Sequence, residues 1–201
     1  LKPFAMLAEK LGAFAGQIVD DGLEEVEIEY EGEVAKLNMR PLTATALAGI
    51  LRPLLQDVNV VSAPALLKER GVPLTESTRD ASPIYDSLIR IKVKTGGKWR
   101  TLAGAVVAGA PKIAEVKGMQ LEAAFHPVML FVNNSDKPGF IGALGTMLAD
   151  AGVNIATFHL GREAAGEDAI ALVGVDQVIG DDLLVRIKAL PQVRYAKVLR
   201  F

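Results

Sequence analysis

The chain has 201 residues, half of them apolar, a formal net charge of −2 and no cysteine. This length suits one large or two small domains. Without cysteine there is no disulfide framework and no thiolate chemistry. Two histidines far apart in sequence exclude a histidine-rich metal site.

Membrane and nucleic-acid partners are also disfavoured. No apolar run approaches the roughly 20 residues of a membrane span, and no signal-peptide pattern is present. The chain has no basic footprint large enough for nucleic acid. The first residue is Leu rather than Met, as in a fragment or a processed chain. We therefore expect a cytoplasmic protein with no metal.

The first elements are predicted by hydrophobic periodicity. Apolar residues at helical spacing predict an amphipathic helix over residues 3–18. Residues 25–31 alternate strictly between acidic and apolar, which indicates a half-buried strand with a carboxylate face. Residues 90–94 alternate in the same way with bases outward. Because opposite charges on neighbouring strands attract by roughly 0.2–1 kcal/mol per pair, we expect these two strands to share a sheet. The alternative is an acidic docking face.

The middle of the chain is predicted in shorter pieces. The sequence predicts, in order, a helical run at 41–55, a strand at 58–61, a short helix ending at Gly71, a loop at 72–83, a hairpin of 88–94 and 99–107 around the turn 95–98, and an extended pair within 112–124. Phe125-His126-Pro127 interrupts this pattern. We therefore place a domain boundary there, giving domains 1–126 and 127–201.

The last part of the chain has the clearest pattern. It reads as strand, helix, strand, strand, helix, strand, with the helices at 139–151 and 181–189 and the strands at 128–132, 153–160, 169–176 and 193–200. This βαββαβ order is typical of two split βαβ units on one antiparallel sheet. The fold class is therefore α+β.

A polar turn joins the first strand and helix of this part. Pro138 suits the first turn of a helix and Asp136 suits an N-cap, so a plain helix start is one interpretation. The other is a site for a small zwitterion. Gly139 allows close approach to the backbone, a helix N-terminus attracts a carboxylate, and Asn154 offers both a donor and an acceptor.

These residues also carry a resemblance. Asp136-Lys137-Pro138-Gly139 followed by Gly152-Val153-Asn154-Ile155 resembles the ACT domain, a small-ligand regulatory module with a ferredoxin-like fold. The earlier stretches Val60 to Ala65 and Glu69 to Val72 are similar to the intervening, allosteric substrate-binding α/β domain of the long-form D-3-phosphoglycerate dehydrogenase family. The resemblance covers essentially the whole chain.

The resemblance implies a function and a set of site residues. It implies that L-serine or another small amino acid binds at an interface between ACT domains of a homo-oligomer. Asp136 would contact the ammonium group, and Asn154 of a neighbouring chain would close the site. The effector-binding set is Asn134, Asp136, Pro138, Gly139, Phe140, Ile141, Asn154 and Ile155. Asn134 departs from the family, which often has His or Tyr there.

The resemblance also suggests an anion site in the intervening domain. Lys112 matches one of its basic positions, but Ala124 and Gly174 stand where further cations are expected. The alternative for Lys112 is a solvated surface residue.

No catalytic residues are expected in this chain. It has no Gly-x-Gly-x-x-Gly dinucleotide fingerprint after a strand, and Gly142 and Gly145 favour a close-packing contact instead. The resemblance implies NAD as a cofactor of the parent enzyme, on domains outside this sequence. Two alternatives remain. One is a purely structural oligomerisation module, with an edge at 128–132 or 193–199. The other is an independent enzyme such as part of a serine dehydratase, against whose iron–sulfur form the lack of cysteine argues.

Overall fold

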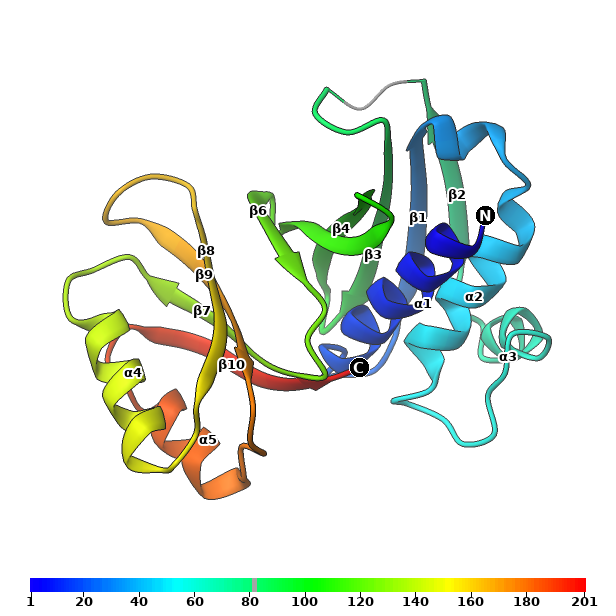
Figure 1. The fold of residues 1–201 in the computed structure, drawn as a ribbon. Coiled ribbons are helices and arrows are strands. Elements are labelled where there is room, and N and C mark those ends of the chain that lie inside the picture. Colours follow the sequence, from blue (N-terminus) through cyan, green and yellow to red (C-terminus); the bar gives the residue numbers. More distant parts are fainter. Residues whose placement is uncertain (81–82) are drawn as a thin grey trace. The chain divides into compact units, whose positions relative to one another are not determined.

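The computed structural model describes residues 1–80 and 83–201, and they form two compact units, Leu1–Gly118 and Met119–Phe201. We call these unit 1 and unit 2 (Figure 1). The predicted boundary at residues 125–127 lies C-terminal to the observed division between the units, which falls between Gly118 and Met119. No helix among the described residues is long and apolar enough to cross a membrane.

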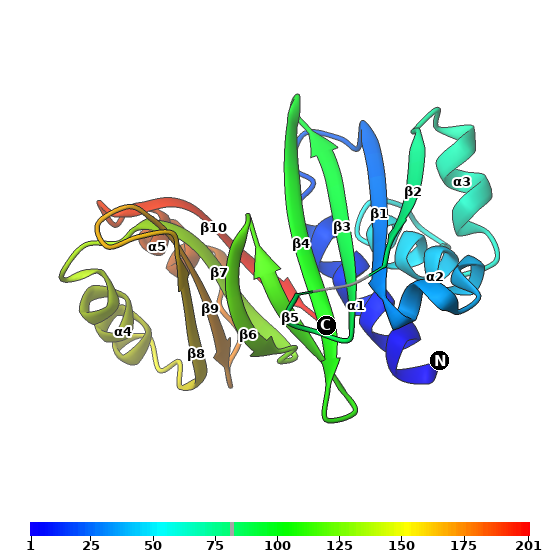
Figure 2. The ribbon, with the colours of Figure 1, turned by 90° about the horizontal axis from the view of Figure 1, so that it is seen from above.

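Unit 1 is a sheet covered on one face by helices (Figures 1 and 2). Its strand order is β2-β1-β3-β4-β5, with β1 parallel to β2 and the other pairs antiparallel. Its elements are α1 (Lys2–Gln17), β1 (Glu25–Gly32), the 3-10 helix η1 (Glu33–Lys36), α2 (Met39–Leu51), α3 (Ala63–Glu69), β2 (Leu74–Arg79), β3 (Ser87–Thr95), β4 (Lys98–Val107) and β5 (Ala110–Val116).

The predicted pairing of the acidic and basic strands is confirmed. β1 runs antiparallel to β3, with Glu27 opposite Lys92 and Glu29 opposite Arg90. The apolar residues of β1 point to the other face, where Val26, Ile28 and Tyr30 are completely buried. The alternation of charge and apolar side chains therefore sets both the register and the buried face.

Glycines bring α1 and α2 into close contact. A Cβ atom at Gly12 would lie 2.2 Å from the Ala46 carbonyl oxygen, and one at Gly49 would lie 2.4 Å from the Glu9 carbonyl oxygen. No side chain fits in these places, so the two helix backbones touch directly.

Three local predictions in unit 1 are wrong. Residues 58–61 do not form a strand, because Asn59 and Ser62 exchange side-chain and backbone hydrogen bonds that close a turn. The predicted loop at 72–83 contains β2, a polar, exposed edge strand held by parallel pairing with β1; residues 81 and 82 of that loop lie outside the described residues. The helical run at 41–55 ends at Leu51.

Unit 2 contains the predicted ferredoxin-like order. Two helices cover one face of a sheet with the strand order β10-β7-β9-β8 (Figure 1). Its elements are β6 (Met119–Ala124), β7 (Val128–Ser135), α4 (Phe140–Asp150), β8 (Ile155–Arg162), β9 (Asp168–Val175), α5 (Asp181–Lys188) and β10 (Val193–Arg200).

The core of unit 2 lies between the sheet and the helices. Phe140, Leu144 and Leu148 of α4 pack with Leu183 and Ile187 of α5 on the apolar strand residues. Of the two edges predicted for this sheet, β10 is an edge, whereas residues 128–132 lie in β7 between β10 and β9. The prediction of an edge at residues 128–132 is therefore wrong, because β7 is paired on both sides.

Candidate functional site

The turn between β7 and α4 differs from a plain helix start. Helix α4 begins at Phe140, and its N-cap is Gly139 in the left-handed conformation, with φ of 93° and no side-chain cap. Pro138 therefore precedes the helix instead of lying in its first turn, and the prediction that Asp136 is an N-cap is wrong. Pro138 and Gly139 are exposed, and a Cβ atom at Gly139 would meet nothing within 4 Å.

Asp136 ties this turn to the connection between β8 and β9. Its Oδ2 accepts a hydrogen bond from Arg162 Nη1 at 2.9 Å and a longer one from the Gly166 N–H at 3.4 Å. Its own N–H donates to the Glu167 carbonyl at 2.7 Å. The carboxylate is largely buried, with 20% of the side chain exposed, while the Arg162 side chain is more than half exposed. The pair therefore lies at the rim of the turn.

The first turn of α4 presents donors. The Phe140 N–H makes only a long 3.5 Å contact with the Lys137 carbonyl, and the first regular helical bond runs from Ala143 to Gly139. Among the described residues, the N–H groups of Ile141 and Gly142 have no backbone acceptor. Both residues are exposed. Unpaired N–H groups at a helix N-terminus attract an anion such as a carboxylate.

Asn134 supplies a buried acceptor beside the turn. The residue is 1% exposed, and its Nδ2 donates to the Ser135 carbonyl at 3.1 Å. Its Oδ1 is buried and has no donor among the described residues. Leaving such an oxygen unpaired costs about 1–3 kcal/mol, so a ligand that donates a hydrogen bond here would be favoured. Neighbouring Asn133, in contrast, donates to Asp168 Oδ1 and to the Ala169 carbonyl.

Asn154 and Ile155 lie at the other end of α4 from the turn (Figure 1). The helix has 11 residues and is therefore about 16 Å long. Asn154 is exposed, and its Nδ2 donates to Asp176 Oδ2 at 2.7 Å. Ile155 packs against the core of unit 2. A single chain therefore brings Asn134, Asp136 and residues 138–141 together, but not Asn154 with them.

Lys112 lies in unit 1, on β5 opposite Ala105, and is half-buried. No ion pair with Lys112 is found among the described residues. Gly174 on β9 leaves no room for a side chain, because a Cβ atom there would lie 2.4 Å from Thr157 Oγ1 and 3.0 Å from the His126 ring. A lysine or arginine at position 174 would therefore displace the side chains of Thr157 and His126.

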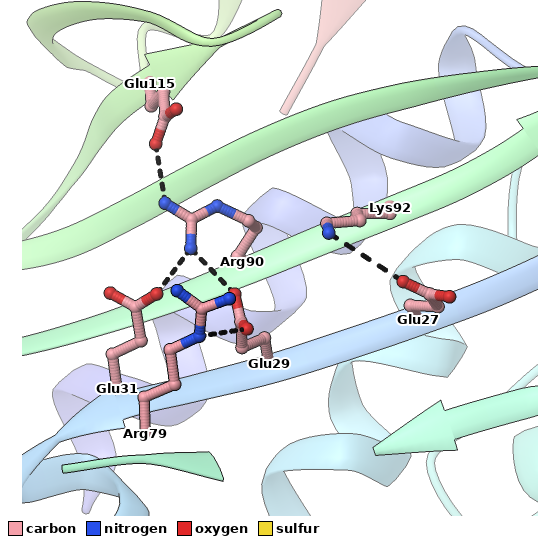
Figure 3. A network of polar contacts seen from close by, with 7 residues as sticks. All are labelled: Glu27, Glu29, Glu31, Arg79, Arg90, Lys92 and Glu115. Atoms are coloured by element: carbon pink, nitrogen blue, oxygen red, sulfur yellow. Dashed lines mark hydrogen bonds and ion pairs between the residues drawn. The ribbon is translucent and has the colours of Figure 1, made fainter. Parts of the chain in front are cut away.

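A second polar feature, which sequence reasoning found only in part, lies on the helix-free face of the unit 1 sheet (Figure 3). Arg90 Nη1 donates to Glu29 Oε2 at 2.8 Å and to Glu31 Oε1 at 2.5 Å, while its Nη2 donates to Glu115 Oε2 at 2.8 Å. Arg79 Nε lies 2.7 Å from the other oxygen of Glu29. We call these five residues the Arg90 cluster.

The protonation states within the Arg90 cluster follow from its hydrogen bonds. Burial alone would lower the pKa of Arg90, but the hydrogen bonds that it donates to Glu115, Glu29 and Glu31 outweigh this effect and raise that pKa. Burial likewise tends to raise the pKa of Glu29, and the hydrogen bond from Arg90 with the charge of Arg79 lowers it overall. Arg90 and Glu29 are therefore charged at neutral pH.

The cluster borders a groove of about 550 Å³ that also includes Lys92, Trp99 and Lys117. The alternating charges of β1 and β3 predicted the Glu29–Arg90 contact. The hydrogen bond between Arg90 and Glu115 could not be predicted from the sequence, because it depends on β5 lying next to β4. Within the Arg90 cluster the acids and bases are paired with each other, which favours a structural role over a ligand site.

Comparisons with known proteins agree with this architecture. A family model described as the D-3-phosphoglycerate dehydrogenase intervening domain matches residues 1–117. Over nearly its whole length the chain is similar to proteins named D-3-phosphoglycerate dehydrogenase. It is 32% identical to that of Methanocaldococcus jannaschii (99% of this chain), 29% to that of Bacillus subtilis (99%) and 31% to that of Synechocystis (100%).

The chain spans only part of these relatives, namely 38%, 38% and 37% of their lengths. The matched intervening domain takes up more than half of the chain, from residue 1 to residue 117. The chain therefore belongs to the family defined by the intervening domain of D-3-phosphoglycerate dehydrogenase.

Proposed function

We propose that this chain is the regulatory part of an NAD-dependent D-3-phosphoglycerate dehydrogenase of L-serine biosynthesis. In this proposal unit 2 is an ACT domain that binds L-serine or a similar small amino acid, and the catalytic and NAD-binding residues belong to the rest of such an enzyme. The names of the relatives and the partial coverage of their lengths support the assignment.

One observation supports amino-acid binding most directly. Among the described residues the buried Oδ1 of Asn134 has no donor, and the N–H groups at the start of the helix that follows the turn have no backbone acceptor. An α-amino acid carries an ammonium donor and a carboxylate acceptor on the same carbon atom. Its ammonium group would donate to Asn134 Oδ1, and its carboxylate would accept from the N–H groups at the start of α4. Asp136, already paired with Arg162, would add negative charge near the ammonium group.

The proposed site requires a second copy of the chain. Asn154 lies about 16 Å from the turn along α4, so the Asn154 that closes the site would come from a neighbouring chain. Ile141 is 52% exposed beside the turn, and β10 is an edge strand of its sheet, the kind of strand that can pair with a strand of another chain. Binding at such an interface stabilises one arrangement of the two chains over another. It can in this way change the activity of attached catalytic domains.

Isothermal calorimetry with L-serine tests the proposal. We expect saturable heat with the chain, at least 10-fold weaker binding for Asn134→Ala because the ammonium group loses its acceptor, and no comparable loss for Asn59→Ala, an asparagine in an exposed turn of unit 1. An absence of heat with L-serine, glycine and L-alanine at millimolar concentration would contradict amino-acid binding.

The edge strand β10 also fits a purely structural oligomerisation module. Analytical ultracentrifugation of the same samples separates the two functions. A stable oligomer that neither binds amino acids nor changes with them would favour the structural role. An oligomer whose dissociation constant falls when L-serine is added would favour the regulatory one, because binding across an interface must stabilise it.

A further inference from the structure

The carboxylate of Asp176, the residue that follows β9, lies between two side chains from different parts of unit 2. Its Oδ2 accepts a hydrogen bond from Asn154 Nδ2 at 2.7 Å. Its other oxygen, Oδ1, lies 3.9 Å from Nε2 of His126. The side chain is 43% exposed. One carboxylate thus contacts both the start of β8 and the connector Phe125–Pro127 that precedes β7.

Asn154 is held in one orientation by these contacts. Besides the side-chain bond to Asp176, its N–H donates to Gln177 Oε1 at 2.7 Å, and its carbonyl accepts from the Asp176 N–H at 3.1 Å. Asp176 is a hydrogen-bond acceptor, so it binds the Nδ2 end of the Asn154 side-chain amide and not the Oδ1 end. The acceptor Oδ1 is therefore turned away from Asp176, and the direction of the amide depends on where that carboxylate lies.

His126 lies against the end of β9, in the space that Gly174 leaves free because it has no side chain. A Cβ atom at Gly174 would lie 3.0 Å from Cγ and 3.1 Å from Cβ of His126. Because glycine leaves this space free, the imidazole reaches the carbonyl of Val175, 3.1 Å from Nε2. The same nitrogen faces Asp176. A displacement of the connector would therefore move a group that touches Val175 and Asp176 directly.

We propose that Asp176 is a positioning residue that couples the connector residue His126 to the orientation of Asn154. This inference rests on the proposed function, in which Asn154 closes the amino-acid site of a neighbouring chain. When His126 moves, the Asp176 carboxylate and the Asn154 amide move with it, and the affinity of the partner's site for the amino acid changes. By reciprocity, amino-acid binding to Asn154 biases the position of the connector.

The charged surroundings of this group are simple. Asp176 faces His126 from the connector and Asn154 from the start of β8, while Gln177 next to it is neutral. The coupling is therefore a local hydrogen-bond and contact effect. It differs from a purely structural role of Asp176 because it predicts that His126, which has no hydrogen bond with Asn154 among the described residues, changes the environment of the Asn154 amide.

A first experiment needs no ligand. The side-chain amide resonances of Asn154 are observed by 15N NMR in the chain and identified by their loss in Asn154→Ala. We expect them to shift in Asp176→Ala and, by a smaller amount, in His126→Phe, which keeps a ring but removes the nitrogens. His159→Phe, at the chain's other histidine, and Asp150→Asn, at an exposed acid of α4, are matched controls that should leave them unchanged. Unshifted Asn154 resonances in His126→Phe would overturn the coupling.

A second experiment measures affinity for L-serine by calorimetry. We expect Asp176→Ala to bind roughly 10-fold more weakly, as for the loss of one charge-assisted hydrogen bond, with Asp176→Asn retaining most of the affinity because its amide oxygen can still accept. His126→Phe should change the affinity several-fold in the wild-type background and not in the Asp176→Ala background. Equal effects in both backgrounds would overturn the coupling.

The two proposals fail in different ways. If the wild-type chain gives no heat with L-serine but the Asn154 resonances respond to His126→Phe, the proposed function is wrong and the coupling of the connector to Asn154 through Asp176 stands without its regulatory role. If L-serine binds and Asn154→Ala abolishes binding, but neither Asp176→Ala nor His126→Phe has an effect, the coupling alone is wrong. Circular dichroism of each variant confirms that it is folded.

Discussion

Arg90 reaches across a neighbouring strand to Glu115. Arg90 lies on β3 and Glu115 on β5, and the residue of β4 that pairs with both is Ala103. The guanidinium nevertheless bonds the carboxylate at 2.8 Å. A methyl side chain at this position leaves the space that the guanidinium needs, and Ala103 is fully buried. The Arg90 cluster in this way connects β1 to β5 on the face that no helix covers (Figure 3).

Replacing Arg90 by Met should lower the free energy of unfolding by about 3–5 kcal/mol, because it leaves buried carboxylates without their cation. The Glu29 and Glu31 side chains are only 11% and 5% exposed. Urea denaturation measures this change. The matched control is Arg52→Met, which breaks the exposed pair with Glu9 and should cost less than about 1 kcal/mol. Similar losses for the two variants would contradict a special role for the cluster.

Glu29 should make the protein sensitive to acid. Its pKa is lowered from the usual 4.5 in the folded state, so the unfolded chain takes up a proton first as the pH falls. The stabilisation from Glu29 is complete above pH 4.5 and is lost as the pH drops through the lowered pKa. Glu29→Gln should therefore flatten the acid side of a plot of unfolding free energy against pH. An unchanged slope below pH 4.5 would show that other carboxylates govern it.

Tyr30 should make the protein sensitive to alkali. Burial, together with the charge of Glu76, raises the pKa of Tyr30 to about 12, although the hydrogen bond with Thr43 acts in the opposite direction. The folded state therefore keeps its proton after the unfolded chain has lost it. Stability from this group is complete below pH 10 and is lost as the pH rises from 10 to about 12. Tyr30→Phe should remove this loss, as measured by unfolding at pH 9 and pH 11.5.

Two glycine-to-alanine substitutions should have opposite effects. Gly49→Ala would place a Cβ atom 2.4 Å from the Glu9 carbonyl oxygen and force α1 and α2 apart, at a cost of roughly 1–3 kcal/mol. Gly145→Ala in α4 meets nothing within 4 Å and should stabilise the chain by up to about 1 kcal/mol through helix propensity. Thermal unfolding of both variants measures the difference. A stabilised Gly49→Ala variant would contradict the close helix contact.

Gly142 and Gly145 were predicted to make a close-packing contact. A Cβ atom at either position meets nothing within 4 Å, so that contact is not made among the residues that the structure describes.

The sequence predicted the fold where burial and charge alternate. Strands β1 and β3 could be paired from their charges alone, and the element order of unit 2 followed from its apolar periodicity. Strand β2 could not be found, because its residues are polar and exposed and it is held mainly by the backbone of β1. Residues 58–61 resembled a strand because three of them are valines, whereas side-chain hydrogen bonds between Asn59 and Ser62 make this segment a turn.

The candidate site was predictable in place but not in detail. The motif located the turn and Asn154, and the structure gathers the residues of the turn as expected. The motif could not show that Arg162, 26 residues away in sequence, already occupies the Asp136 carboxylate. Nor could it show that Asn134 Oδ1 has no hydrogen-bond donor in the described part of the chain. Both depend on which strands become neighbours, and these contacts are long-range. The roles of all eight residues in ligand binding stay predictions.

Because of the length of α4, the apparent affinity of the proposed site for an amino acid would depend on the concentration of the protein. The turn and Asn154 lie at opposite ends of this helix, so a site that uses both takes one half from each of two chains. Two chains related by a two-fold axis then form two equivalent sites at once. Dilution that separates the chains would abolish both sites together, and the apparent affinity would fall as the protein is diluted. A sensor built in this way reports the abundance of its own subunits together with that of the amino acid.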